Sequence, residues 1–86
     1  MTYHESIERH FQSLRGSERF MLSTDDWGLV SQWQLNRIPL VCVLRGLDEA
    51  FRKHAAKRAR HETVNGIKYC APHILREWHK TRGRHT

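Results

Sequence analysis

The first segment of the chain carries apolar residues at helical spacing, with charged residues between them. Thr2 and Glu5 have the spacing of a capping box, in which each side chain satisfies an end amide of the helix. Gly16 is a suitable residue to end this helix. The pattern therefore predicts an amphipathic helix between Thr2 and Gly16. Its apolar stripe consists of Tyr3, Ile7, Phe11 and Leu14.

A second capping box predicts a short helix that begins after Ser23. Asp26 follows Ser23 by three residues, and Leu22 is placed to pack against Trp27 as a hydrophobic staple. We expect Asn36 to end this helix in the left-handed conformation. The predicted buried side consists of Trp27, Leu29, Val30 and Trp33.

The third helix is predicted to open at Ile38-Pro39, because proline at the first helical position loses no hydrogen bond. Its apolar residues indicate that it is the spine of the fold. The sequence of 52–60 is rich in alanine and long basic residues, which favour helix, so we expect the helix to continue to near Arg60 while leaving the core. The apolar spine consists of Leu40, Leu44, Leu47 and Phe51, flanked by Val43 and Ala50.

The last apolar set follows a predicted turn at 63–66 and contains Pro72, which either starts a new helix or kinks a longer one. This set consists of Ile67, Tyr69, Cys70, Ile74, Leu75 and Trp78. The four helical segments predict an all-α fold, a compact bundle of about four helices. We expect a single helical domain over 1–80 and a flexible basic tail over 81–86.

The length of 86 residues suits one small domain without a deep enclosed pocket. No apolar run approaches the roughly 18–20 residues of a membrane span, and the first residues lack the pattern of a secretory signal. Cys42 and Cys70 lie within apolar stretches, so we interpret them as buried thiols rather than as a disulfide. These features predict a cytoplasmic protein without a membrane partner.

The charge is distributed unevenly along the chain. Residues 52–86 contain ten basic and two acidic side chains, a net charge of +8, whereas residues 1–51 carry −2. A potential concentrated on one part of a protein favours a polyanionic partner, and nucleic acid is the most common one. His54 and His61 would extend the positive charge below about pH 6.5.

Candidate nucleic-acid contacts come from the basic second half. Its lysines and arginines can neutralise phosphates, and Tyr69 and Trp78 can stack on unpaired bases if they are exposed. The alternative for both aromatic residues is packing in the core, which the spacing of Trp78 from Ile74 favours. The candidate residues are Arg52, Lys53, Lys57, Arg58, Arg60, Lys68, Tyr69, Arg76, Lys80, Arg82 and Arg84.

Other chemistry is poorly supported. Cys70, His73 and His79 are the closest potential metal ligands, but they lack the paired spacing of a zinc site. The adjacent carboxylates Asp25-Asp26 cap a helix, and in the pair Asp48-Glu49 we expect Glu49 to bind Arg45 and Lys53. We therefore expect no enzyme activity, no cofactor and no small-molecule substrate.

The order of these signals resembles the C-terminal domain of DnaD-like primosomal and phage replisome-organiser proteins. The resemblance covers residues 25–78. In this chain the tyrosine precedes the isoleucine by five residues, whereas the family spaces them by four, and Pro72 lies within the motif. The matching positions are Trp33, Ile38, Leu44, Asp48, Ala50, Asn65, Lys68, Tyr69, Ile74, Leu75 and Trp78. The resemblance implies binding of single- and double-stranded DNA during replication, through the Tyr/Ile/Trp motif and the basic residues after it.

Two functions are therefore predicted. The first is a small module that binds nucleic acid without sequence specificity, and we favour DNA over RNA as its partner. The alternative is an accessory or adaptor subunit of a larger assembly that docks through an exposed apolar face. That face would consist of Phe20, Met21, Trp27 and Trp33.

Overall fold

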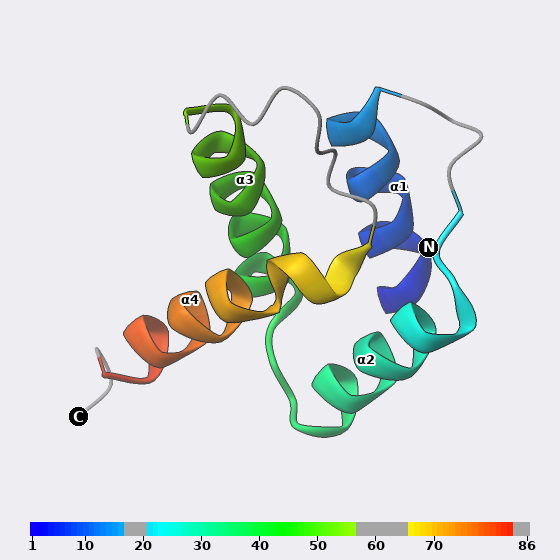
Figure 1. The fold of residues 1–86 in the computed structure, drawn as a ribbon. Helices are drawn as coiled ribbons and strands as arrows, with labels where there is room; N and C mark the ends of the chain where they lie inside the picture. Colours follow the sequence, from blue (N-terminus) through cyan, green and yellow to red (C-terminus); the bar gives the residue numbers. More distant parts are fainter. Residues whose placement is uncertain (17–20, 57–65, 84–86) are drawn as a thin grey trace.

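The computed structural model describes residues 1–16, 21–56 and 66–83. These residues form four α-helices and one short 3₁₀ helix, without any strand in the described ranges, and they fold into one compact globule (Figure 1). The predicted all-α fold of four helices is confirmed. The elements are α1 (Tyr3–Arg15), α2 (Thr24–Leu35), α3 (Leu40–Ala56), η1 (Ile67–Cys70) and α4 (Ala71–Gly83).

Local signals define both ends of α1. The Thr2 hydroxyl accepts a hydrogen bond from the Glu5 amide at 3.1 Å, and the Thr2 amide donates to the Glu5 carboxylate at 3.3 Å. Gly16 adopts the left-handed conformation with φ 74° and donates to carbonyls of the last turn. Because these bonds satisfy amides that the helix itself leaves unpaired, they set where it begins and ends. The predicted helix between Thr2 and Gly16 is confirmed.

The predicted capping box of α2 is also confirmed, but the end of this helix differs from the prediction. Asn36 has φ −80°, and Arg37 is the left-handed residue with φ 60°. The Arg37 amide donates to the Gln34 carbonyl and the Ile38 amide to the Trp33 carbonyl, each at 3.0 Å. These two bonds form a Schellman motif, which requires the left-handed residue one position after the C-cap. The hydrogen bonds of the motif therefore place the left-handed conformation at Arg37, although asparagine adopts this conformation more readily than arginine.

Helix α3 begins at Leu40, and the carbonyl of Pro39 accepts hydrogen bonds from the Cys42 and Val43 amides. Proline thus lies immediately before the helix, within one residue of its predicted place. The described part of α3 ends at Ala56, so the predicted continuation towards Arg60 lies outside the described residues.

The last apolar segment is divided into two elements. Pro72 therefore lies at the start of a new helix and does not kink a longer one. Helix α4 starts afresh at Ala71 after η1, and Pro72 is its second residue, where no hydrogen bond within the helix is lost. The helix continues through Thr81 and Arg82 to Gly83, so the first three residues of the expected tail are helical. Residues 84–86 lie outside the described residues.

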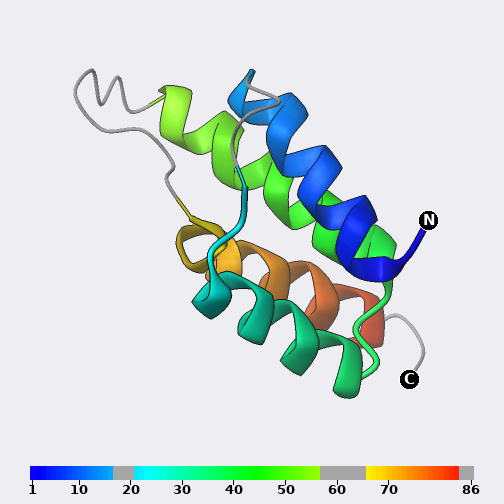
Figure 2. The ribbon, with the colours of Figure 1, turned by 90° about the vertical axis from the view of Figure 1, so that its right-hand side faces the viewer.

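Helix α3 lies at the centre and contacts α1, η1 and α4. Helices α1 and α3 run side by side in the same direction, while α4 crosses α3 in the opposite direction (Figures 1 and 2). At the crossing, a Cβ atom built on Gly46 would lie 2.5 Å from the Ile74 Cα atom. The absence of a side chain at Gly46 therefore permits the close approach of the two backbones.

The core is formed by all four helices together with η1. Leu47 is fully buried, as predicted for the spine of α3, whereas Leu40, Leu44 and Phe51 are partly buried against the core. Both cysteines are buried free thiols, as predicted. The other buried apolar side chains are Ile7, Phe11, Leu22, Val30, Trp33, Ile38, Val43, Ala50, Ile67 and Ile74.

Candidate nucleic-acid interface

The first group of basic residues lies at the C-terminal half of α3. The Arg52 guanidinium donates to both oxygens of Glu49, with Nη2 2.8 Å from Oε1 and 2.7 Å from Oε2. The Lys53 ammonium lies 3.6 Å from Glu49 Oε1. One carboxylate therefore serves two cations, and the cluster keeps a positive charge. The predicted pair of Glu49 with Lys53 is confirmed, while Arg52, three residues after Glu49, takes the place predicted for Arg45.

The ion pairing changes the titration of both partners. The hydrogen bonds from Arg52 hold the pKa of Glu49 below its ordinary value, and they raise the pKa of the Arg52 guanidinium. Both groups remain charged at neutral pH. Because the side chain of Arg52 is 71% exposed, its pair with Glu49 is a surface interaction in competition with water and other anions.

Residues of η1 join this group through Tyr69. The Tyr69 hydroxyl lies 3.4 Å from His54 Nδ1, and the two rings meet edge to face with their centroids 5.6 Å apart. Tyr69 is 44% exposed, and Lys68 beside it is exposed. We define the first basic group as Arg52, Lys53 and Lys68, with Tyr69 as its exposed aromatic residue.

The second basic group, Lys80 and Arg82, lies near the C-terminal end of α4. The Lys80 ammonium is 3.3 Å from Glu77, and the Arg82 guanidinium carbon lies 4.8 Å from the centre of the Trp78 ring. Trp78 is partly buried against the core, as its spacing from Ile74 predicts. Since Arg82 also covers its ring, Trp78 is less available for base stacking than Tyr69.

The two basic groups lie at opposite ends of α3. Thr81 Oγ1 lies 3.5 Å from Cys42 Sγ, which places the second group beside the start of α3, whereas the first group includes Lys53. At a rise of 1.5 Å per residue, Cys42 and Lys53 are about 16 Å apart along the helix axis. Arg76 is an exposed residue near the middle of α4. The predicted contacts Lys57, Arg58, Arg60 and Arg84 lie outside the described residues.

The exposed apolar face that the adaptor alternative predicts is found only in part. Trp33 is only 4% exposed and belongs to the core, which confirms its predicted place on the buried side of α2 and contradicts the exposure that the adaptor alternative needs. Trp27 is partly buried and stacks on His4 with ring centroids 5.2 Å apart. Met21 is 73% exposed, and Phe20 lies outside the described residues. Both tryptophans pack inwards because the face of α2 that carries them is the one that meets the other helices.

The carboxylates serve structural roles that the sequence revealed only in part. Asp26 caps α2 as predicted, but it is buried and its Oδ1 also accepts a hydrogen bond from the Ile67 amide at 3.2 Å. Asp48 binds His10 of α1 with Oδ1 2.7 Å from Nε2. A spacing of 38 or 41 residues carries no local signal, so these two contacts were not predicted.

Within residues 1–16, 21–56 and 66–83, no three potential ligands among His, Cys, Asp and Glu come together as they would around a metal ion. None of the described helices is long and apolar enough to cross a membrane.

Comparison of the chain with protein-family models, with curated proteins and with solved structures gave no match. The resemblance to DnaD-like domains therefore stays a prediction that depends on the motif residues alone.

Proposed function

We propose that this protein is a small helical module that binds nucleic acid by contacting phosphates without reading sequence. DNA is the favoured partner, in replication or DNA remodelling, as the resemblance to DnaD-like domains implies. Six described residues would carry the contacts: Arg52, Lys53, Lys68, Arg76, Lys80 and Arg82.

The observation that carries the proposal is the exposure of these cations and the kind of ion pairs that they form. Five of them are exposed and Lys53 is half-exposed. Arg52, Lys53 and Lys80 pair with Glu49 or Glu77, three or four residues away on the same helix. Exposed pairs of this kind contribute little to stability. A phosphate can therefore replace the carboxylate without a change in the fold, and it meets a side chain that is already partly ordered.

The separation of the basic groups favours a polymer over a small anion. A single phosphate or carboxylate ligand could reach one group, but groups about 16 Å apart along α3 can engage a continuous phosphate backbone together. Contacts made at both ends of one chain reinforce each other, because the second contact forms within the same complex.

The predicted salt dependence is steep. Six phosphate contacts on duplex DNA give a slope of about −5 for the logarithm of affinity against the logarithm of salt concentration, and about −4 on a single strand. Phosphate contacts carry no sequence information, so we expect affinities for unrelated duplexes to agree closely.

Fluorescence anisotropy with labelled duplex and single-stranded oligonucleotides at several salt concentrations tests the proposal. The double variant Lys53→Gln with Lys80→Gln removes one cation from each group and should reduce the slope by about 2. The matched control is Arg9→Gln with Arg37→Gln, which removes two exposed cations from the first half of the chain. An equal effect of the two double variants would contradict the proposed interface.

The adaptor alternative is distinguished by size-exclusion chromatography before and after nuclease treatment. Bound nucleic acid that nuclease removes supports the proposed function. A protein that purifies without nucleic acid and binds no oligonucleotide at low salt would favour docking to another protein.

A further inference from the structure

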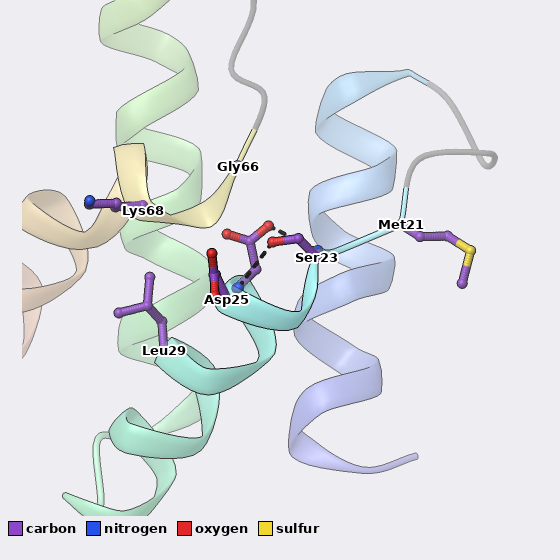
Figure 3. Close-up of a pocket in the computed structure, with 7 residues that line it drawn as sticks. Met21, Ser23, Asp25, Leu29, Gly66 and Lys68 are labelled. Atoms are coloured by element: carbon purple, nitrogen blue, oxygen red, sulfur yellow. Dashed lines mark hydrogen bonds between the residues drawn. The ribbon is translucent and has the colours of Figure 1, made fainter.

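A surface pocket of about 600 Å³ lies where α2 begins and η1 approaches it (Figure 3). Its lining includes Asp25 and Leu29 of α2, together with Gly66 and Lys68. The volume is within the range of about 300–1,000 Å³ that small-ligand pockets occupy. None of the phosphate contacts proposed above, except that of Lys68, involves this pocket.

Asp26 fixes the distance between the two walls of the pocket. Its Oδ2 accepts a hydrogen bond from the Ser23 amide at 3.1 Å, and its Oδ1 accepts one from the Ile67 amide at 3.2 Å. A Cβ atom on Gly66 would lie 3.3 Å from Asp26 Oδ1, so a larger residue there would crowd the carboxylate. The pocket is therefore held open by a buried carboxylate rather than by mobile side chains.

The neighbouring carboxylate, Asp25, is available for a ligand. It is exposed, and within the described ranges it has no hydrogen bond or ion pair. Figure 3 shows Asp25, Leu29 and Lys68 on the same side of the capping box, and Met21, which also lines the pocket, on the other side. The pocket thus combines a hydrogen-bond acceptor, an apolar surface and a cation.

This combination matches one nucleotide of a single strand. A base stacks or packs on apolar surface through its ring, its phosphate pairs with a cation, and an exocyclic amino group donates to a carboxylate. In a duplex the bases are stacked and their ring faces are covered, so an unpaired base fits the pocket better. Thymine and uracil have no exocyclic amino group, and the two carbonyl oxygens that flank their N3–H donor would be repelled by the carboxylate.

Resting on the proposed nucleic-acid binding, we propose that this pocket selects an unpaired base that carries an exocyclic amino group. Asp25 accepts the hydrogen bond from the amino group, Leu29 contacts the ring, and Lys68 binds the adjoining phosphate. Tyr69 follows Lys68 directly and lies against His54 of α3. A strand that leaves the pocket therefore passes the exposed tyrosine ring on its way to Arg52 and Lys53.

Anisotropy titrations with labelled oligo(dC), oligo(dA) and oligo(dT) of equal length test the inference. We expect the wild-type protein to bind oligo(dC) at least about tenfold more tightly than oligo(dT), the usual effect of one hydrogen bond to a charged group. The variant Asp25→Ala should bring this ratio to about one, since it removes the acceptor that distinguishes the two bases. It also removes a negative charge that repels the phosphates of both oligonucleotides. Lys68→Gln should weaken binding of both oligonucleotides alike.

Two controls separate the possible outcomes. Thr24→Ala changes an exposed neighbour in the first turn of α2, and Glu5→Gln removes a carboxylate from the first turn of α1; neither should alter the ratio. Equal wild-type affinities for oligo(dC) and oligo(dT) would overturn the base pocket and leave phosphate binding intact. Absence of binding to every oligonucleotide would overturn both proposals. The wild-type ratio decides the matter even if Asp25→Ala fails to fold.

Discussion

Helices α1 and α4 pack against α3 by different means. On the α1 side, large side chains separate the helices: the rings of Phe11 and Phe51 meet edge to face with centroids 5.4 Å apart, and His10 bonds to Asp48 across the surface. On the α4 side, the backbones approach closely at Gly46. Side chains can shift to absorb a change, whereas backbone atoms of two packed helices cannot. The α3–α4 crossing should therefore tolerate substitution less well than the α1–α3 contact.

The variant Gly46→Ala should produce the largest loss of stability. The added Cβ would lie 2.5 Å from Ile74 Cα and 2.7 Å from Ile74 N, and it would also meet Ile74 Cγ1. Forcing the helices apart should cost more than the roughly 1 kcal/mol that alanine gains over glycine in helix propensity. We expect a net loss of about 2–3 kcal/mol and a melting temperature lower by roughly 10–20 °C in a circular-dichroism melt.

Gly28→Ala is the matched control for this experiment. Gly28 lies within α2, is exposed, and a Cβ atom there meets nothing within 4 Å. Only the gain in helix propensity applies, so this variant should be more stable by up to about 1 kcal/mol. If Gly46→Ala melted at or above the wild-type temperature, the two glycines would be equivalent and the close crossing would have no energetic role.

A substitution in the α1–α3 contact should lower the free energy of unfolding by less than Gly46→Ala does. Phe11 is fully buried, and Phe11→Leu keeps most of the apolar volume while losing the ring contact with Phe51. We expect a loss of about 1–2 kcal/mol, since near-isosteric swaps and single aromatic contacts each contribute about 1 kcal/mol. Urea denaturation of this variant and of Gly46→Ala under the same conditions gives the comparison directly. A larger loss for Phe11→Leu would reverse the ranking of the two interfaces.

Local features of the helices could be predicted from the sequence. The caps at Thr2 and Ser23 and the stripes of α1 and α3 depend on residues three or four positions apart, so spacing alone reveals them. The Gly46–Ile74 crossing depends on residues 28 positions apart, and an isolated glycine in a helix carries no mark of what approaches it. The left-handed Arg37 has no signal in the sequence, because asparagine adopts this conformation more readily than arginine and Asn36 stands directly before it.

The candidate site was predictable in its composition but not in its arrangement. Its excess of cations can be counted in the sequence, whereas the separation of Lys53 from Lys80 depends on the antiparallel crossing of α3 and α4. The pairing of Arg52 with Glu49 depends on rotamers at three-residue spacing, where the sequence offered Arg45 as an equal alternative. The pocket beside Asp25 arises from the long-range bond between Asp26 and Ile67, so no local pattern could indicate it.

Alkaline pH should first destabilise the protein at Cys70, the buried residue directly before α4. Burial raises the pKa of the Cys70 thiol from its ordinary 9.0 to about 12, with the charge of Asp26 adding to the effect. Below pH 9 the thiol is neutral in both states and has no effect on stability. Between pH 9 and 12 the unfolded chain releases this proton while the folded protein retains it, so the free energy of unfolding should fall by about 1.4 kcal/mol per pH unit.

The variant Cys70→Ala isolates this effect. It should lack the decline in the free energy of unfolding between pH 9 and 10 that we expect urea denaturation to show for the wild type. On the α1 side, burial raises the pKa of Tyr3 from 10.0 to about 12, so any contribution from this partly exposed phenol should begin only above pH 10. Identical slopes for Cys70→Ala and the wild type between pH 9 and 10 would show that the thiol does not control the alkaline response.

The polar bridge between α1 and α3 should have the smallest effect. His10 Nε2 lies 2.7 Å from Asp48 Oδ1, but the two side chains are 29% and 57% exposed, and exposed pairs typically contribute about 0.2–1 kcal/mol. A double-mutant cycle with His10→Gln and Asp48→Asn at neutral pH should give a coupling energy within that range. A coupling above about 2 kcal/mol would mean that a specific polar contact holds α1 in place. The α1–α3 helices are separated by side chains, whereas the α3–α4 backbones approach closely. In that case this difference would no longer explain which of the two interfaces tolerates substitution.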